Sequence, residues 1–155
     1  MGCGKSTVGA LVAARRGAVF TDLDRLVEES AGSSVEEIFA VRGEAVFREL
    51  EKEMVAVALE RGGVIALGGG TPMDDASWRA LKARAVTVWL DAPLEQMAGR
   101  LGAGEGRPLA ASGAPRELGR LYRQRRSRYA DAHHRVEAGR PLEHVVEEVA
   151  WLWSE

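Results

Sequence analysis

The first residues of the chain have the types and the spacing of a loop that binds phosphate groups. The run Gly2-Cys3-Gly4-Lys5-Ser6-Thr7 matches the second part of the pattern G-x-x-x-x-G-K-[ST]. In that pattern backbone N–H groups surround the phosphates, the lysine reaches the β- and γ-phosphates, and the Ser/Thr hydroxyl binds Mg²⁺. We therefore expect Lys5 to contact phosphate and Ser6 to bind the metal. Met1 falls on the third position of the pattern, so its first glycine is not in this sequence.

Two carboxylates follow the first predicted strand. Residues 18–22 form a short apolar run that ends in Asp22, and Asp24 lies two positions further on. Ligands of open α/β sheets gather beyond the carboxyl ends of the strands, so both side chains should face the same crevice as the loop. Such a pair could serve a hydrated Mg²⁺ and a substrate hydroxyl. The alternative is that Asp24 only caps a following helix.

Three consecutive glycines, Gly68, Gly69 and Gly70, follow the second predicted strand at 64–67. Glycine loses more conformational entropy on folding than other residues, so a run of three at a strand end indicates a ligand that lies against bare backbone. A flexible connector is the alternative.

Arginines offer a third kind of chemistry. Arg107 lies within a stretch rich in Gly, Ala, Ser and Pro at about 101–115, and a connection of this length is usually functional, often as a lid. A lid arginine could stabilise charge on a phosphate as the lid closes. Arg48 lies off the apolar stripe of the helix predicted over 44–61, and periodicity alone favours a solvated position for it.

Helices and strands that must position these residues alternate along the chain. An Ala- and Leu-rich stretch without proline predicts a helix from Lys5 to Arg16, whose N-terminus would point at the phosphates. Further helices are predicted at 35–41, 44–61, 75–84, 93–100, 116–130 and 142–153. Buried strands are predicted at 18–22, 64–67 and 86–91, with a short edge strand at 135–137. This order predicts a doubly wound α/β domain with an insert lid.

Composition narrows the class of protein. A chain of 155 residues is long enough for one domain with a sizeable core, and its net charge of −2 disfavours binding to nucleic acid or to a membrane surface. Its one cysteine, Cys3, excludes an internal disulfide and fits a reducing compartment. No leader or apolar run long enough to span a membrane is present, so we expect a cytoplasmic protein.

Taken together, the motifs resemble those of shikimate kinase, a small member of the nucleoside-monophosphate-kinase-like P-loop group, over essentially the whole chain. They occur in the order and at the spacing of that family. The resemblance rests on the segments 2–7, 22–24, 46–51, 68–70, 107–109 and 125–129.

The resemblance implies phosphorylation of the shikimate 3-hydroxyl by ATP with Mg²⁺, in a monomer with a P-loop three-layer α/β/α fold. Helices at about 24–61 would bind the substrate. The implied catalytic residues are Lys5, Asp24 and Arg107, and the implied metal ligands are Ser6 and Asp22. The implied nucleotide contacts are Gly2, Cys3, Gly4, Lys5, Ser6, Thr7, Arg100, Arg107 and Arg140. The implied shikimate contacts are Asp24, Arg48, Gly68, Gly69, Gly70 and Arg125, with Arg126 left open as an alternative to Arg125 for the carboxylate.

The sequence departs from the family pattern at its beginning. The family's first strand lies in the middle of the sheet, and about ten further residues upstream would supply it. Without it we expect two unpaired neighbouring strands, an apolar slot in the core, poor folding and weak ATP binding. Two other functions remain open: a related kinase for another polyol acid such as gluconate, and a truncated, inactive nucleotide-binding chain.

Overall fold

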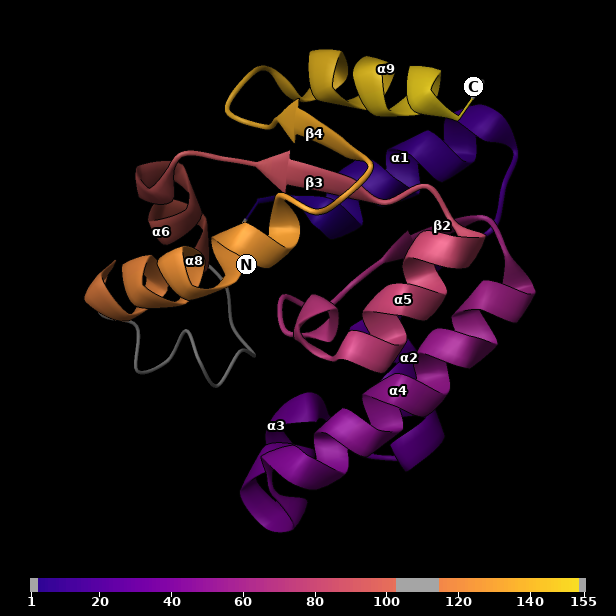
Figure 1. Cartoon of the computed structure of the whole chain (residues 1–155), viewed down its shortest axis with the longest axis vertical. Coiled ribbons are helices and arrows are strands. Elements are labelled where there is room, and N and C mark those ends of the chain that lie inside the picture. Colours follow the sequence, from indigo (N-terminus) through magenta and orange to yellow (C-terminus); the bar gives the residue numbers. More distant parts are fainter. Residues whose placement is uncertain (1–2, 103–114, 154–155) are drawn as a thin grey trace.

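The computed structural model describes residues 3–102 and 115–153, and helices dominate it (Figure 1). The four strands are β1 (Phe20–Asp22), β2 (Val64–Ala66), β3 (Val88–Asp91) and β4 (His134–Glu137). The first half contains the helices α1 (Lys5–Arg16), α2 (Leu23–Ala31), α3 (Val35–Glu37), η1 (Ile38–Arg42) and α4 (Glu44–Arg61). The second half contains η2 (Thr71–Met73), α5 (Asp75–Arg84), α6 (Leu94–Gly102), α8 (Pro115–Tyr129) and α9 (Leu142–Leu152).

Local signals set several helix boundaries. The predicted bounds of α4 and α5 are confirmed, and α1 begins at Lys5 as expected. One interpretation is corrected: Asp22, and not Asp24, caps α2, because the Asp22 side chain accepts a hydrogen bond from the Asp24 N–H at 3.1 Å. A carboxylate two positions ahead of a free N–H has the reach that an N-cap needs.

The strands form two separate parallel pairs in place of one continuous sheet. β1 pairs with β2, with Phe20 opposite Val64, and β3 pairs with β4, with Val88 opposite His134. Among the described residues, no ladder joins β2 to β3. The expected gap between neighbouring strands is therefore present, whereas the single sheet is not.

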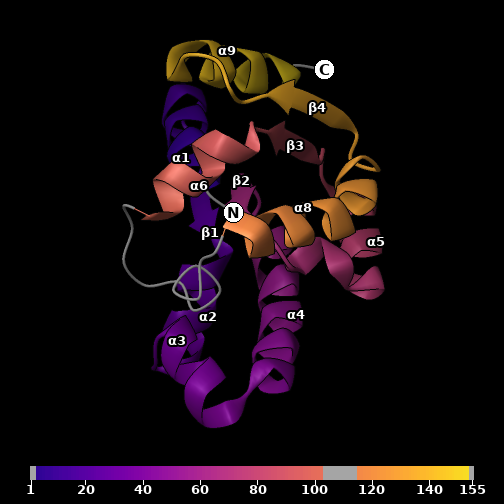
Figure 2. The same cartoon turned by 90° about the vertical axis from the view of Figure 1, so that its left-hand side faces the viewer.

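Apolar contacts hold the helices around the two strand pairs. α1 packs along α9, and their buried residues, among them Val12 and Val146, form one core cluster with Val136 of β4. α2 and α4 pack together, and Leu23, Val55 and Trp78 belong to a second cluster. Figure 2 shows α2, α3 and α4 projecting from the body that carries the strands. The region predicted at 24–61 is thus helical.

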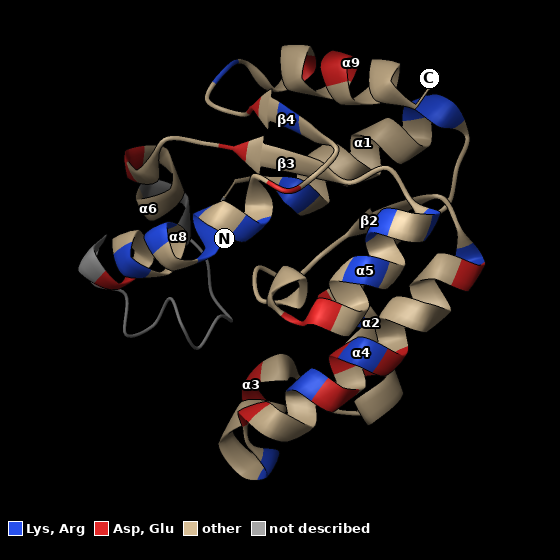
Figure 3. Cartoon of the chain, in the orientation of Figure 1, with Lys and Arg blue, Asp and Glu red and all other residues tan. Residues whose placement is uncertain are grey.

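Charged residues are spread over the surface of the helices. Figure 3 shows acidic and basic residues interspersed on α4 and α5, and arginines on successive turns of α8. None of the helices in the described ranges has the length and apolar character needed to cross a membrane. The cytoplasmic location and the monomeric state stay predictions. The predicted lid falls mainly in 103–114, outside the described residues.

Candidate active site

One small cavity gathers most of the residues singled out in the sequence. Its volume is about 90 Å³, and it lies between the start of α1, the carboxyl ends of β1 and β2, and α4. Its polar lining is Lys5, Ser6, Asp22, Asp24, Arg48, Glu51, Gly68, Gly69, Gly70 and Arg125. Both carboxylates and the glycine run therefore meet at the carboxyl ends of β1 and β2, where we expected them.

The start of α1 has the features of an anion site. Gly4 precedes the helix with φ 85° and ψ 20°, a left-handed conformation that favours glycine. The first turn of α1 contains no acidic residue, and among the described residues no side-chain hydrogen bond caps the helix at its N-cap residue, Gly4. The free N–H groups and the positive end of the helix dipole are therefore left for a phosphate group. The Lys5 Nζ lies 3.8 Å from the Cys3 Sγ and also lines the cavity.

Ser6 and Asp22 offer two hard oxygen ligands side by side. The Ser6 Oγ donates a hydrogen bond of 2.6 Å to Oδ2 of Asp22. Mg²⁺ prefers such oxygens and usually keeps several waters, so it needs only one or two protein ligands beside substrate phosphates. No cluster of three or more His, Cys, Asp or Glu side chains suited to a metal occurs in the ranges 3–102 and 115–153. The pair therefore fits Mg²⁺ held together with a nucleotide.

Arg48 does not stand free in solvent as periodicity favoured. Its side chain is 25% exposed, and its guanidinium donates to Glu51 at 2.8 Å and to Glu44 at 3.1 Å. It also lies over the ring of Phe47, 5.1 Å from the centroid. Burial acts to lower the pKa of Arg48, but the two carboxylates outweigh it and raise the pKa. Arg48 thus stays charged at the wall of the cavity.

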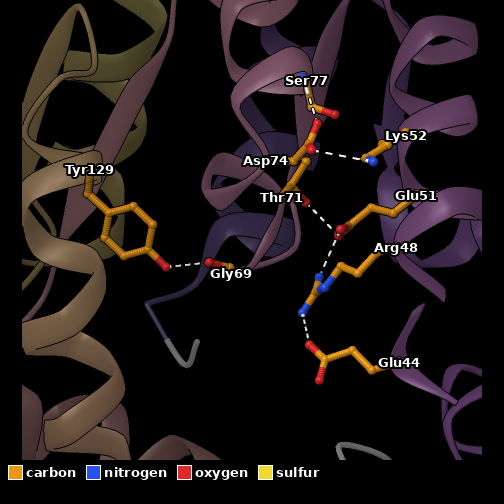
Figure 4. Close-up of polar contacts among 9 residues, drawn as sticks. All are labelled: Glu44, Arg48, Glu51, Lys52, Gly69, Thr71, Asp74, Ser77 and Tyr129. Atoms are coloured by element: carbon orange, nitrogen blue, oxygen red, sulfur yellow. Dashed lines mark hydrogen bonds and ion pairs between the residues drawn. The ribbon is translucent and has the colours of Figure 1, made fainter. Parts of the chain in front are cut away.

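Glu51 is the site residue that the sequence reasoning missed. Its side chain is 4% exposed, and its carboxylate accepts hydrogen bonds from Arg48 and, at 2.6 Å, from the Thr71 Oγ1 (Figure 4). A buried carboxylate with two partners connects α4 to η2, directly beyond the glycine run. The signal that could have found it is the spacing of three between Arg48 and Glu51, which places both on one side of a helix.

Two glycines of the run, Gly68 and Gly70, lie in close contact with charged side chains. A Cβ on Gly68 would lie 2.8 Å from Glu51 Oε1 and 3.1 Å from Asp24 Oδ1, and a Cβ on Gly70 would lie 2.6 Å from the Arg48 guanidinium. Neither glycine has a positive φ. Side chains at these positions would therefore push the three charged groups away from the backbone. Close approach to the chain's own charged side chains thus accounts for both glycines, and the ligand expected against this backbone stays a prediction.

Helix α8 reaches the same glycine run from the other side. The Tyr129 hydroxyl donates to the Gly69 carbonyl at 2.6 Å (Figure 4), and burial raises the pKa of that phenol. Arg125, one turn earlier on α8, lines the cavity, whereas Arg126 lines a separate surface hollow with Trp89 and Arg135. Of the two arginines left open, Arg125 is the one at the site.

Some predicted residues lie elsewhere. Arg140 donates to the Glu137 carbonyl at 3.1 Å and pairs with Glu148, beside the start of α9. Thr7 is exposed and does not line the cavity. Gly2, Arg107 and the side chain of Arg100 lie outside the described residues. The nucleotide contacts implied for these positions stay predictions.

A lysine and a serine at a helix N-terminus, facing paired acids and an arginine across one cavity, define the class of P-loop kinases that act on small molecules. The family model for shikimate kinase matches residues 1–151, so the chain belongs to the shikimate kinase family. Its function is that of the family, the ATP-dependent phosphorylation of shikimate to shikimate 3-phosphate.

Relatives and solved structures agree with this family. Shikimate kinase from Salinibacter ruber is 41% identical over 94% of this chain and 77% of the relative. The enzyme from Moorella thermoacetica is also 41% identical, over 99% of this chain and 93% of the relative. The structure of shikimate kinase from Acinetobacter baumannii in complex with shikimate has a TM-score of 0.94 at 30% identity, covering 99% of this chain and 88% of that one.

Proposed function

We propose that the cavity is the place where the terminal phosphate of ATP meets the 3-hydroxyl of shikimate. The observation that carries this proposal is that one cavity is lined by Lys5, Ser6 and Asp22 and also by Asp24 and Arg48. Phosphoryl transfer needs mainly positioning and charge neutralisation from the protein, and this lining supplies both.

Three residues form the nucleotide half of the proposed site. Lys5 and the N–H groups at the start of α1 bind the phosphates. The lysine brings a full positive charge to the cavity, and the N–H groups bring the partial positive charge of a helix N-terminus. Ser6 and Asp22 would hold Mg²⁺, because they offer two hard oxygen atoms side by side. When bound, the ion neutralises charge on the phosphates. The hydrogen bond between Ser6 and Asp22 keeps both oxygens at one position before the ion arrives.

The acceptor half consists of Asp24, Arg48, Arg125 and the glycine run. Shikimate carries a carboxylate, and a guanidinium pairs with a carboxylate through two parallel hydrogen bonds. Glu51 and Glu44 accept two of the five N–H donors of Arg48, so donors remain for a ligand. Asp24, whose Oδ1 lies against the Gly68 backbone, accepts the hydrogen bond of the reacting hydroxyl and serves as its base.

The assay that tests substrate choice compares shikimate with gluconate. This chain, with Mg²⁺ and ATP, is assayed in a coupled reaction that detects ADP, with each hydroxy acid in turn. We expect turnover with shikimate only, because the arginines that line the site, Arg48 and Arg125, suit the carboxylate of a compact ring acid. Faster turnover of gluconate would assign the site to the other polyol acid, and no turnover with either would support the inactive nucleotide-binding alternative.

Asp24→Asn tests the proposed base. We expect kcat to fall about 10²- to 10⁴-fold with little change in the KM for shikimate, because the amide can still accept a hydrogen bond but cannot take the proton. Asp131→Asn, a change at an exposed carboxylate that pairs with Lys82, is the matched control. Equal kcat values for the two variants would remove Asp24 from the catalytic role.

A further inference from the structure

Away from the active site, one side of α8 borders a hollow on the surface of the protein. The hollow is open to the solvent, has a volume of about 520 Å³ and is lined by Trp89, Arg123, Arg126, Ser127, Ala130 and Arg135. These six residues are all separate from the lining of the active-site cavity. We call this feature the arginine hollow. Its three positive charges take no part in the phosphoryl transfer proposed above.

Helix α8 presents different arginines to the active site and to the arginine hollow. Arg123, Arg126 and Ser127 are three and four residues apart, a spacing that places them on one side of a helix. Arg125 lines the active-site cavity instead. Arg123 and Arg126 are exposed, and within the described residues neither forms an ion pair. Their N–H donors are therefore available to a ligand in the hollow.

The other wall of the hollow comes from β3 and β4. Trp89 and Arg135 are directly opposite each other in the ladder, so both side chains lie on one face of it. The Arg135 guanidinium lies over the Trp89 ring, 5.2 Å from the centroid, and donates to Oδ2 of Asp91 through Nε at 2.9 Å and Nη2 at 2.6 Å. The other Asp91 oxygen accepts from the Tyr122 hydroxyl at 2.8 Å. These contacts hold the guanidinium in one orientation, and its remaining donors face a side chain surface that is 60% exposed.

The charge of the arginine hollow favours a ligand with two negative charges. Three guanidinium groups line it, and the nearly buried Asp91 beneath Arg135 offsets one of them. In the described part of the chain no carboxylate lines the hollow itself, so two positive charges are left over. A phosphate monoester carries a charge of about −1.5 to −2 at neutral pH together with three strong acceptor oxygens. Guanidinium groups pair with such oxygens through two parallel hydrogen bonds.

We propose that the arginine hollow is a second anion site, which binds a small phosphate monoester. The three arginines hold the phosphate group, the Ser127 hydroxyl donates a further hydrogen bond, and the Trp89 ring offers apolar surface to the organic part of the ligand. A long polyanion such as nucleic acid is a poorer fit, because it needs basic residues along an extended surface and this chain has a net charge of −2. A monoanion would leave one positive charge of the hollow unmatched.

Methyl phosphate and methyl sulfate are matched probes for this site. They have the same shape, but above its second pKa of about 6 the phosphate carries one more negative charge. Each is titrated into the chain at about pH 8 and at low ionic strength, where screening is weak. Nuclear magnetic resonance follows the amides of Ser127 and Ala130 and the indole N–H of Trp89. We expect saturable shifts with methyl phosphate and about fivefold weaker binding of methyl sulfate. Phosphate bound at the start of α1 shifts the amides of Lys5 and Ser6 instead, so the two sites are measured separately.

Arg126→Gln tests the site without breaking an ion pair of the described residues. We expect it to weaken the binding of methyl phosphate at the hollow about tenfold, because a charged hydrogen bond is lost, and to leave Tm unchanged. If it lowers Tm, Arg123→Gln makes the same comparison from the preceding turn of α8. Arg120→Gln is the matched control, since Arg120 lies on the same helix and pairs with Glu117. Equal affinities for the two probes, an equal loss in the Arg126 and Arg120 variants, or no saturable shift at the hollow would overturn the proposal.

Discussion

Arg48 shows how a charged side chain is held in place at the wall of the cavity. Its guanidinium is aligned by Glu51 and Glu44 and lies within the space that a Cβ on Gly70 would fill. The helix therefore does not merely carry a positive charge to the cavity. It holds a planar donor in one orientation, which lowers the entropy that a carboxylate ligand must overcome.

Replacing Arg48 by lysine separates charge from geometry. We expect Arg48→Lys to raise the KM for shikimate about tenfold or more, because an ammonium group keeps the charge but loses the fork that pairs with a carboxylate. Steady-state kinetics with shikimate varied at saturating ATP measures this. Arg84→Lys is the control, because Arg84 forms a comparable pair with Glu60 on the surface. If both variants keep the original KM, Arg48 does not bind the substrate.

Glu51 is predicted to act through Arg48 as a positioning residue. We expect Glu51→Gln to lower the free energy of unfolding by about 1–3 kcal/mol, since a buried acceptor of two hydrogen bonds is replaced by a group that can satisfy only part of them. We also expect a higher KM for shikimate with kcat nearly unchanged. The exposed Glu53→Gln is the matched control. An effect on stability without any change in KM would reduce Glu51 to a structural role.

At the scale of the element, α5 depends on its cap. Asp74 accepts a hydrogen bond of 2.8 Å from the Ser77 N–H, and it lies 3.5 Å from Lys52 of α4. The bond to the Ser77 N–H, with smaller contributions from the Ser77 hydroxyl and the Lys52 charge, lowers the pKa of Asp74. α5 leads from the glycine run toward β3, so its start helps to place the Gly68–Gly70 segment.

Removal of this cap should have a pH-dependent effect. We expect Asp74→Ala to lower the free energy of unfolding by about 1 kcal/mol at neutral pH. A lowered pKa in the folded state means that the charged carboxylate adds stability above its unfolded pKa of about 3.9, and that this stability is lost as the pH falls through the folded pKa. Denaturant unfolding at neutral and acid pH should therefore show the difference between the two proteins shrinking below about pH 4.

The control variant keeps a hydrogen-bond acceptor at position 74. Asp74→Ser retains an oxygen that can cap α5 and should recover most of the stability at neutral pH without the same pH dependence. A difference between Asp74→Ala and the original chain that stays constant at all pH values would mean that the carboxylate charge contributes nothing.

For the whole molecule, two cavities meet at the start of the chain. The larger one, of about 250 Å³, lies between β2 and β3 and is bordered by Cys3 and Lys5. Lys5 and Ser6 also border the active-site cavity, so the phosphate-binding loop lies between the two.

Local sequence signals predicted the helices well. α4 ends where Gly62 and Gly63 follow, α5 begins after a capping aspartate, and α1 begins at the lysine of the phosphate motif, because each of these boundaries depends on residues only a few positions apart. The phosphate loop, the acids after β1 and the glycine run were found in the same way. Their meeting in one cavity followed from the rule for strand ends and needed no knowledge of contacts.

The partners of charged residues and the pairing of strands depended on tertiary structure. Arg48 and Glu51 have the pattern of surface charges on a helix, and only the approach of η2 and the glycine run buries them. Strand pairing joins residues far apart in sequence, so the division into two parallel pairs and the cavity between β2 and β3 follow from packing and not from local preference. Residue types and spacing thus predicted the residues for phosphate transfer in this chain, whereas long-range packing decided how they are held together.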